Sequence, residues 1–106
     1  SESSVKLLRL GDVLAIVSKE KRVLILTESD EFRTYFTLTQ LDSILPSDQF
    51  CRVHDSAIVN LDLVEELISL GNHQYEVRVG TNLILPVGRS KYTDLIHRLG
   101  LPKRTA

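Results

Sequence analysis

The segment Phe50–Asn60 of this 106-residue chain, FCRVHDSAIVN, contains the residues best suited to binding chemistry. Apolar β-formers open and close it, and the polar trio His54-Asp55-Ser56 interrupts it. Asp and Ser favour turns because their side chains hydrogen-bond to nearby backbone groups, and a His ring can both donate and accept hydrogen bonds. The pattern predicts two short strands that present a polar loop to a partner.

Two further groups of side chains could bind an anion. Arg89 follows the run Leu83–Val87 at a predicted strand-to-helix junction, where its guanidinium could donate two parallel hydrogen bonds to a guanine. Phosphate contacts would come from Lys19, Lys21 and Arg22 in the turn of a predicted hairpin, and from Lys91. Such contacts contribute salt-dependent affinity without reading a base sequence. Alternatively, these charges belong to solvated faces, and Arg89 pairs with a carboxylate such as Asp55.

Residues of Phe50–Asn60, the signature segment, could also have structural roles instead of binding a partner. His54 could hold its own loop through backbone hydrogen bonds, and Ser56 suits either a phosphate contact or a turn. Asp55 could accept from a cytosine amino group, or could orient His54 or Arg89. Asn60 is expected to be structural, as the cap of the turn that follows.

Composition indicates one soluble domain with an ordinary core, because 42% of the residues are hydrophobic and 25% are charged. No apolar run approaches the roughly 18 residues that a membrane span requires. A single cysteine favours a reducing compartment, and we expect a cytoplasmic protein. The net charge of −1 does not favour nucleic-acid binding, although basic residues cluster at 19–22 and at 89–104.

The sequence does not favour an enzyme. It has no phosphate-cradling glycine loop, no paired acids at a strand end and no nucleophile elbow. Cys51 is expected in the core, and thiol redox sensing is the alternative. A catalytic Cys51–His54 pair would need an orienting third group and a pocket, which the sequence does not suggest. A zinc site from Cys51, His54, His73 and His97 lacks closely spaced ligand pairs. We therefore predict no catalytic residue, metal or cofactor.

Short apolar runs separated by turn residues predict a mainly β domain of antiparallel strands with two short helices. The first helix should begin with Thr37 or Thr39 as N-cap and end at Pro46. The second should begin at Ser90 and end before Gly100. Strands are expected at 5–10, 13–17, 22–27 and 32–36, in the signature segment, and in a meander over 68–87 that follows a helical turn at 61–63.

The signature segment closely resembles the central motif of the LytTR family of bacterial DNA-binding domains, Phe-x-Arg-x-His-[Arg/Asn/Asp]-Ser-x-[Ile/Val]-[Val/Ile]-Asn. Two further segments resemble the family in the expected order: the helix Thr39–Leu45, and Leu85–Tyr92, which is similar to the family's Leu-Pro-Val-Ser-Arg strand end. The resemblance covers residues from about Asp12 to Leu99. Aspartate stands at position 55 where the family often has asparagine or arginine, and Gly88 stands in place of a common serine.

The resemblance implies an elongated stack of small antiparallel sheets with about ten strands, which binds DNA through loops between strands. The implied DNA-binding residues are His54, Asp55, Ser56 and Arg89, with the turn at 19–22 matching a further contact. The implied partner is double-stranded DNA at promoter direct repeats. It further implies the output domain of a transcriptional response regulator in two-component signalling, with a receiver domain upstream and a dimeric full-length protein.

We expect residues 1–4 to be a linker or cloning remnant and residues 5–106 to be the DNA-binding domain. The chain contains no methionine, which suggests that it was processed or cut from something longer. The alternative function is that of a β-rich protein–protein interaction module without DNA binding. DNA binding requires His54, Arg89 and the turn at 19–22 to share one face, whereas an interaction module should expose an apolar patch.

Overall fold

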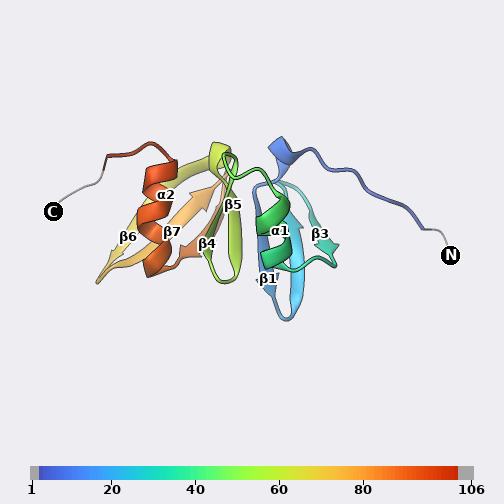
Figure 1. Cartoon of the computed structure of the whole chain (residues 1–106), viewed down its shortest axis with the longest axis horizontal. Helices are drawn as coiled ribbons and strands as arrows, with labels where there is room; N and C mark the ends of the chain where they lie inside the picture. The colour runs from blue at the N-terminus through green and yellow to red at the C-terminus, as the bar shows by residue number, and fades with distance from the viewer. Residues whose placement is uncertain (1–2, 103–106) are drawn as a thin grey trace.

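Short alternating strands build two antiparallel sheets in a computed structural model, which describes residues 3–102 (Figure 1). The first sheet has the strand order β3-β2-β1-β5-β4, and the second has the order β6-β7-β8. The first sheet contains β1 (Ala15–Lys19), β2 (Arg22–Leu26), β3 (Glu31–Thr34), β4 (Phe50–His54) and β5 (Ala57–Asn60). The second contains β6 (Val64–Gly71), β7 (Gln74–Val79) and β8 (Leu83–Val87).

Two short helices flank the sheets. Helix α1 (Leu38–Ile44) begins with a capping box: the Thr37 side chain accepts from the Gln40 backbone N–H, and the Gln40 side chain accepts from that of Thr37. Helix α2 (Tyr92–Arg98) continues from the 3₁₀ turn Arg89–Lys91. Further 3₁₀ turns lie at Leu10–Asp12 and Leu61–Leu63.

The first sheet is buried on both faces at its centre. Along β5, Ala57 and Val59 face the second sheet and α2, whereas Ile58 faces α1. The same alternation along β1 places Ala15 on the first face and Ile16 on the second. All four residues of β5 are therefore buried, which explains why its sequence is a continuous apolar run that ends in Asn60.

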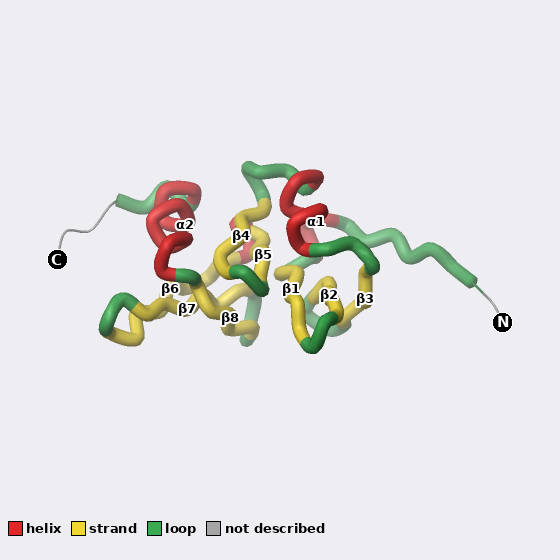
Figure 2. Tube along the Cα trace, turned by 60° about the horizontal axis from the view of Figure 1, so that its bottom comes forward, coloured by secondary structure: helices red, strands yellow, loops and turns green. Residues whose placement is uncertain are grey.

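The second sheet is covered on one face. Its inner residues, including Val77, Leu85 and Val87, pack with Leu95 of α2 and with the first sheet. Figure 2 shows α2 over one side of β6–β8 and the other side open. Pro86 lies on the edge strand β8, as predicted from its missing N–H.

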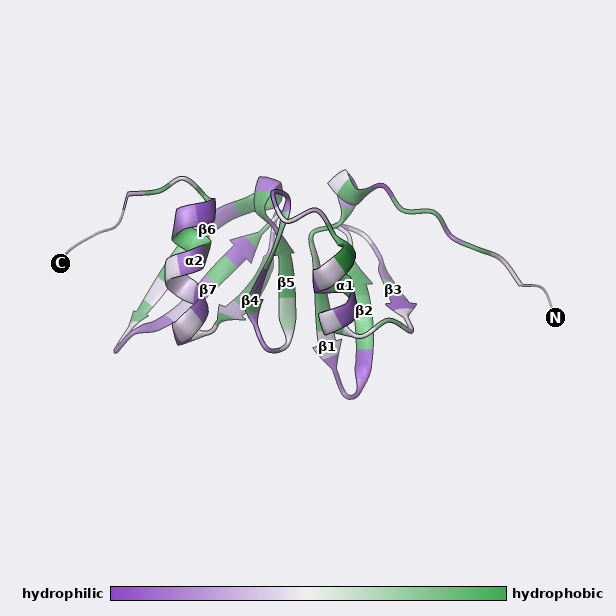
Figure 3. Cartoon of the chain, viewed as in Figure 1, coloured by the Kyte–Doolittle hydropathy of each residue, from purple (hydrophilic) through white to green (hydrophobic). Residues whose placement is uncertain are grey.

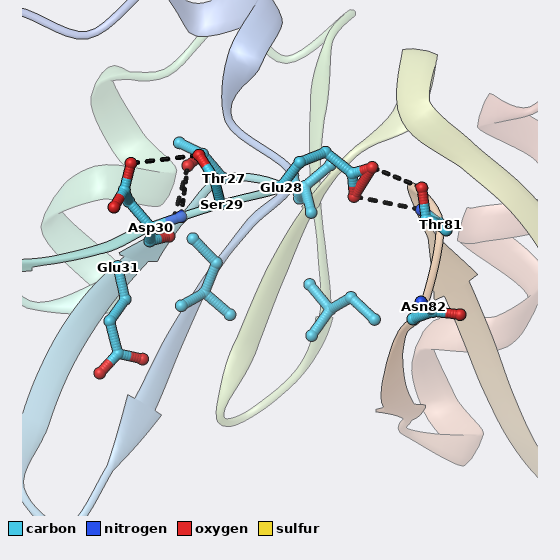
Figure 4. A pocket seen from close by; sticks show the side chains of 10 residues that line it. Thr27, Glu28, Ser29, Asp30, Glu31, Thr81 and Asn82 are labelled. Carbon is cyan, nitrogen blue, oxygen red and sulfur yellow. Dashed lines mark hydrogen bonds between the residues drawn. The ribbon is translucent and has the colours of Figure 1, made fainter.

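The two sheets are also joined by a polar latch at their rims. The carboxylate of Glu28, in the turn after β2, accepts hydrogen bonds from Thr81 Oγ1 at 2.6 Å and from the Thr81 backbone N at 3.2 Å (Figure 4). Both bonds lower the pKa of Glu28 from its ordinary value of 4.5. Gly80 makes room for the latch, because an added Cβ would lie 2.7 Å from both Glu28 Oε1 and Leu14 Cδ2.

Most expected elements are confirmed, including the mainly β class, the Thr37 cap, the turn at 61–63 and the meander. The described residues contain eight strands, whereas the resemblance implied about ten. The strand expected at 5–10 is wrong, because residues 3–9 are extended without a partner strand and lead into a 3₁₀ turn. The Ser90 cap is also wrong: Ser90 lies inside a 3₁₀ turn, and Lys91 precedes α2 without a side-chain cap.

Two tight hairpin turns contain residues with positive φ that are not glycine. These are Glu20 (53°) and Lys21 (63°) between β1 and β2, and Asn72 (53°) and His73 (58°) between β6 and β7. Asparagine and histidine are among the residues with a side chain that occur there most often, but glycine adopts this region without a steric cost.

We therefore predict that His73→Gly stabilises the domain by roughly 0.5–1 kcal/mol, because Asn-Gly is the preferred pair for this turn. His73→Ala retains the strain and should give no gain. Urea unfolding of the three proteins tests this, and equal midpoints for His73→Gly and the parent would contradict it.

We also predict that the latch contributes stability that depends on pH. Because the Glu28 pKa is lowered by folding, its contribution is present above the ordinary carboxyl pKa of 4.5 and is lost as pH falls through the lowered value. Glu28→Ala should therefore reduce the melting temperature at pH 7 more than at about pH 3. Glu31→Ala, an exposed acid on β3, is the control. The same reduction at both pH values would show that the carboxylate charge is not involved.

Candidate nucleic-acid interface

One row of loops along the long axis brings the predicted binding segments together. The Ser18 backbone N donates to Ser56 O at 2.9 Å, which joins the β1–β2 and β4–β5 turns. The Gly88 N donates to Val53 O at 2.6 Å, which joins the residue before Arg89 to strand β4. Arg89 Nη2 in turn donates to Asn72 O in the β6–β7 turn at 3.4 Å. These loops follow the lower edge of the molecule in Figure 1.

The half-buried His54 ring forms the centre of the β4–β5 loop. Its Nδ1 accepts a hydrogen bond from the Ser56 backbone N at 3.1 Å and lies 2.8 Å from Ser56 Oγ. An Nδ1 that accepts from a backbone N–H places the proton of a neutral ring on Nε2. His54 thus holds its own loop, as its structural alternative required, while Nε2–H remains a donor.

Arg52 supports the same loop, and sequence reasoning did not identify it. Its guanidinium donates to Asp55 O at 2.6 Å, to His54 O at 3.3 Å and to Thr39 Oγ1 at 3.1 Å. The signal was the arginine of the signature motif itself, on the strand face opposite Cys51 and Val53. Asp55 is left exposed at the tip of the loop.

Arg89 is exposed and close to the same loop. A Cβ added to Gly88 would lie 4.0 Å from the Cα of His54, so Arg89 begins one residue away from the β4–β5 turn. The ion pairs among residues 3–102 are Arg78–Glu66 and Arg98–Asp94, so the alternative pairing of Arg89 with Asp55 is not present. Lys91 is half-buried in the same 3₁₀ turn, with its Cγ 3.5 Å from that added Cβ.

The β1–β2 turn presents Lys19, Lys21 and Arg22, all exposed, at one end of this row. The positive φ of Glu20 and Lys21 makes the reversal tight, so these cations project beyond the sheet. The C-terminal residues Lys103 and Arg104, which added to the basic cluster at 89–104, lie outside the described residues.

A basic cleft beside the row was also missed. It lies between the β1–β2 turn, the β3–α1 loop and the β4–β5 loop, and its cations are Lys21, Arg22, Arg33 and Arg52. Tyr35 at its rim is 85% exposed, and the Arg33 guanidinium lies 4.7 Å from the centre of the Tyr35 ring. The sequence predicted a strand over residues 32–36, but β3 ends at Thr34, so Tyr35 lies in the loop that follows.

Cys51 lies in the core and Asn60 caps the turn that follows it, as the sequence predicted. Cys51 is 1% exposed, and burial raises the pKa of its thiol to about 11, against the weaker effect of nearby Arg98. A protonated, buried thiol does not favour redox sensing. Asn60 Oδ1 accepts from the Asp62 N at 3.0 Å, and its Nδ2 donates to Leu10 O and Val13 O.

Residues 3–102 contain no cluster of three or more His, Cys, Asp or Glu side chains able to hold a metal ion. Within the same residues, no helix has the length and apolar character needed to cross a membrane.

Known proteins resemble this chain across nearly its whole length. The family model for the LytTr DNA-binding domain matches residues 3–100. Sensory transduction protein LytT of Bacillus anthracis is 28% identical over 94 residues, and that of Enterococcus faecalis is 24% identical over 100 residues. The matches cover 89% and 94% of this chain but only 38% and 41% of those relatives. The chain thus spans about two fifths of their length.

A solved structure has the same fold. It is described as the LytTr DNA-binding domain of a methyl-accepting/DNA response regulator from Bacillus cereus, and it superimposes with a TM-score of 0.81 at 21% identity. The match covers 89% of this chain and 86% of that one. Because the family model extends from before β1 to the end of α2, this chain belongs to the LytTr DNA-binding domain family.

Proposed function

We propose that the chain binds double-stranded DNA sequence-specifically through its row of inter-strand loops, as the output domain of a transcriptional response regulator in two-component signalling. Membership of a DNA-binding domain family supports DNA as the partner. The observation that carries the proposal is that loops from both sheets align along one edge, with Arg89 and His54 at the centre.

The dimensions of the molecule suit a duplex. Its longest extent is 58 Å, including the extended N-terminal segment, and its other two extents are 26 and 25 Å. The major groove of B-DNA returns to the same face about every 34–36 Å. The molecule with its N-terminal segment is thus longer than one such repeat.

Each residue of the row has a role that its chemistry favours. Arg89 reads guanine O6 and N7, and the His54 Nε2–H donates to a base edge or phosphate. Ser56, bonded to His54, contributes mainly to loop geometry, and Asp55 accepts from a cytosine amino group. Lys19, Lys21, Arg22 and Lys91 contact phosphates, with Arg33 extending this set.

The proposal includes a larger protein around this domain. A receiver domain lies upstream, the full-length protein dimerises in the cytoplasm, and the domain recognises direct repeats in promoters. Dimerisation would raise affinity by effective concentration, which compensates for the modest net charge of −1. The domain acts as a binding module and not as an enzyme.

Selection from a random-sequence duplex pool at two salt concentrations tests the function. We expect enrichment of a short motif, with weaker retention of all sequences at the higher salt concentration. Absence of retention at low salt would contradict DNA binding by this domain. It would favour the protein-interaction alternative, for which the open face of β6–β8 is the candidate surface.

We predict that Arg89→Ala lowers affinity for the selected motif by about 5- to 150-fold, corresponding to the loss of a base contact worth roughly 1–3 kcal/mol, while random DNA is bound nearly as before. Arg89→Lys is the matched control, because it keeps the charge but loses the bidentate geometry. It should also lose discrimination. If Arg89→Ala still distinguishes the motif from random DNA as well as the parent does, the assigned base contact is wrong.

Lys19→Ala should act differently, because a phosphate contact does not read sequence. We expect affinity to fall by a similar factor for specific and random duplexes, and the slope of log K against log salt to become shallower by about 0.9. Titrations at several salt concentrations measure both quantities. An unchanged slope would show that Lys19 belongs to a solvated face.

A further inference from the structure

The second sheet has an open face with exposed apolar side chains. The register aligns Glu66, Arg78 and Ile84 across the three strands in one row, and Ile68, Glu76 and Pro86 in the next. Leu70 follows on the same face by alternation. Leu70 is 55% exposed and Ile84 is 42% exposed, and no described element covers them. Exposed apolar residues gathered on one sheet face indicate a contact surface.

The charges on this face indicate which kind of partner it favours. Arg78 is paired with Glu66 at 3.2 Å, so Glu76 remains as the uncompensated charge between Ile68 and Pro86. The face therefore disfavours DNA, and it also disfavours a second copy of itself, because like charges would meet.

The N-terminal segment has the complementary character. Residues 3–9 run extended past the edge of the first sheet, where Lys6 Nζ lies 5.4 Å from the centre of the Phe32 ring of β3. Val5 is 88% exposed and Leu7 is 87% exposed. Lys6 and Arg9 are the charged residues of this segment, which has no acid. Figure 3 shows hydrophobic positions along this segment, and the described residues leave Val5 and Leu7 largely exposed. An extended, basic and apolar segment is suited to lie along an acidic and apolar sheet.

The two surfaces lie at opposite ends of the molecule (Figure 1), so the segment cannot reach the open face of its own chain. We propose that the occupant of the open β6–β8 face is the extended residues 4–9 of a second copy, docked head to tail. Val5 and Leu7 pack on Ile68 and Ile84, and Arg9, which lies on the same side of an extended chain as Val5 and Leu7, approaches Glu76. Such a contact is heterologous, and it relates successive copies head to tail.

Disulfide trapping between two single variants tests this arrangement in solution without DNA. One protein carries Leu7→Cys and an isotope-labelled second protein carries Ile84→Cys; native Cys51 is buried and does not compete. We expect the mixture to form a mixed disulfide several-fold faster than either variant forms its own dimer. The matched control replaces Ile84→Cys by Ser29→Cys, an exposed position in the turn after β2.

Each alternative outcome overturns the proposal. Equal cross-linking of Leu7→Cys with the Ser29→Cys control indicates random collision. Faster dimerisation of Ile84→Cys alone indicates face-to-face pairing of the open sheets, and no cross-linking indicates that this face binds something other than a second copy. Charge reversal provides a second arm. Arg9→Glu in the first protein should slow the mixed disulfide several-fold, and Glu76→Lys in the second should restore it.

Discussion

The structure depends on the burial of β5 on both of its faces. Ile58 packs toward α1 while Ala57 and Val59 pack toward the second sheet and α2, so one four-residue strand belongs to both hydrophobic cores. Fully burying Ile58 alone is worth roughly 1.5–3 kcal/mol. The strand ends at Asn60, whose buried side chain makes three hydrogen bonds to the backbone of Leu10, Val13 and Asp62. These bonds tie the entry of the first sheet to the connection that leads to the second.

The position of the row of loops follows from this shared strand. Because β5 pairs with β1 on one side and β4 on the other, the β1–β2 and β4–β5 turns must lie next to each other. Because β4 also meets the end of β8 through Gly88, Arg89 is brought to the same edge from a different sheet. The Glu28–Thr81 latch joins the sheets at the opposite ends of their strands. The packing of the two sheets therefore fixes the positions of the loops and the distances between them.

The modest net charge is compatible with this arrangement because the charges are segregated. Cations gather along the loop edge and its neighbouring cleft, and acids gather on β6, β7 and the turn after β2. Such a molecule presents one basic edge to a duplex while its other surfaces repel the duplex. The same segregation leaves the open face of β6–β8 available for contacts that do not compete with DNA.

The sequence by itself determined the mainly β class, the Thr37 and Asn60 caps, the turns and the importance of the signature segment, because these depend on local side-chain chemistry and period. It could not distinguish the exposed alternation of residues 5–10 from a strand, because a strand needs a partner that only the tertiary structure supplies or withholds. It likewise extended a strand to Tyr35 and Phe36, which lie in the loop after β3, and it did not identify Arg52 as a residue that holds the β4–β5 loop. The meeting of Ser18 with Ser56 and of Gly88 with Val53 joins residues 35 or more positions apart. Only the packing of β5 between two sheets decides such long-range contacts.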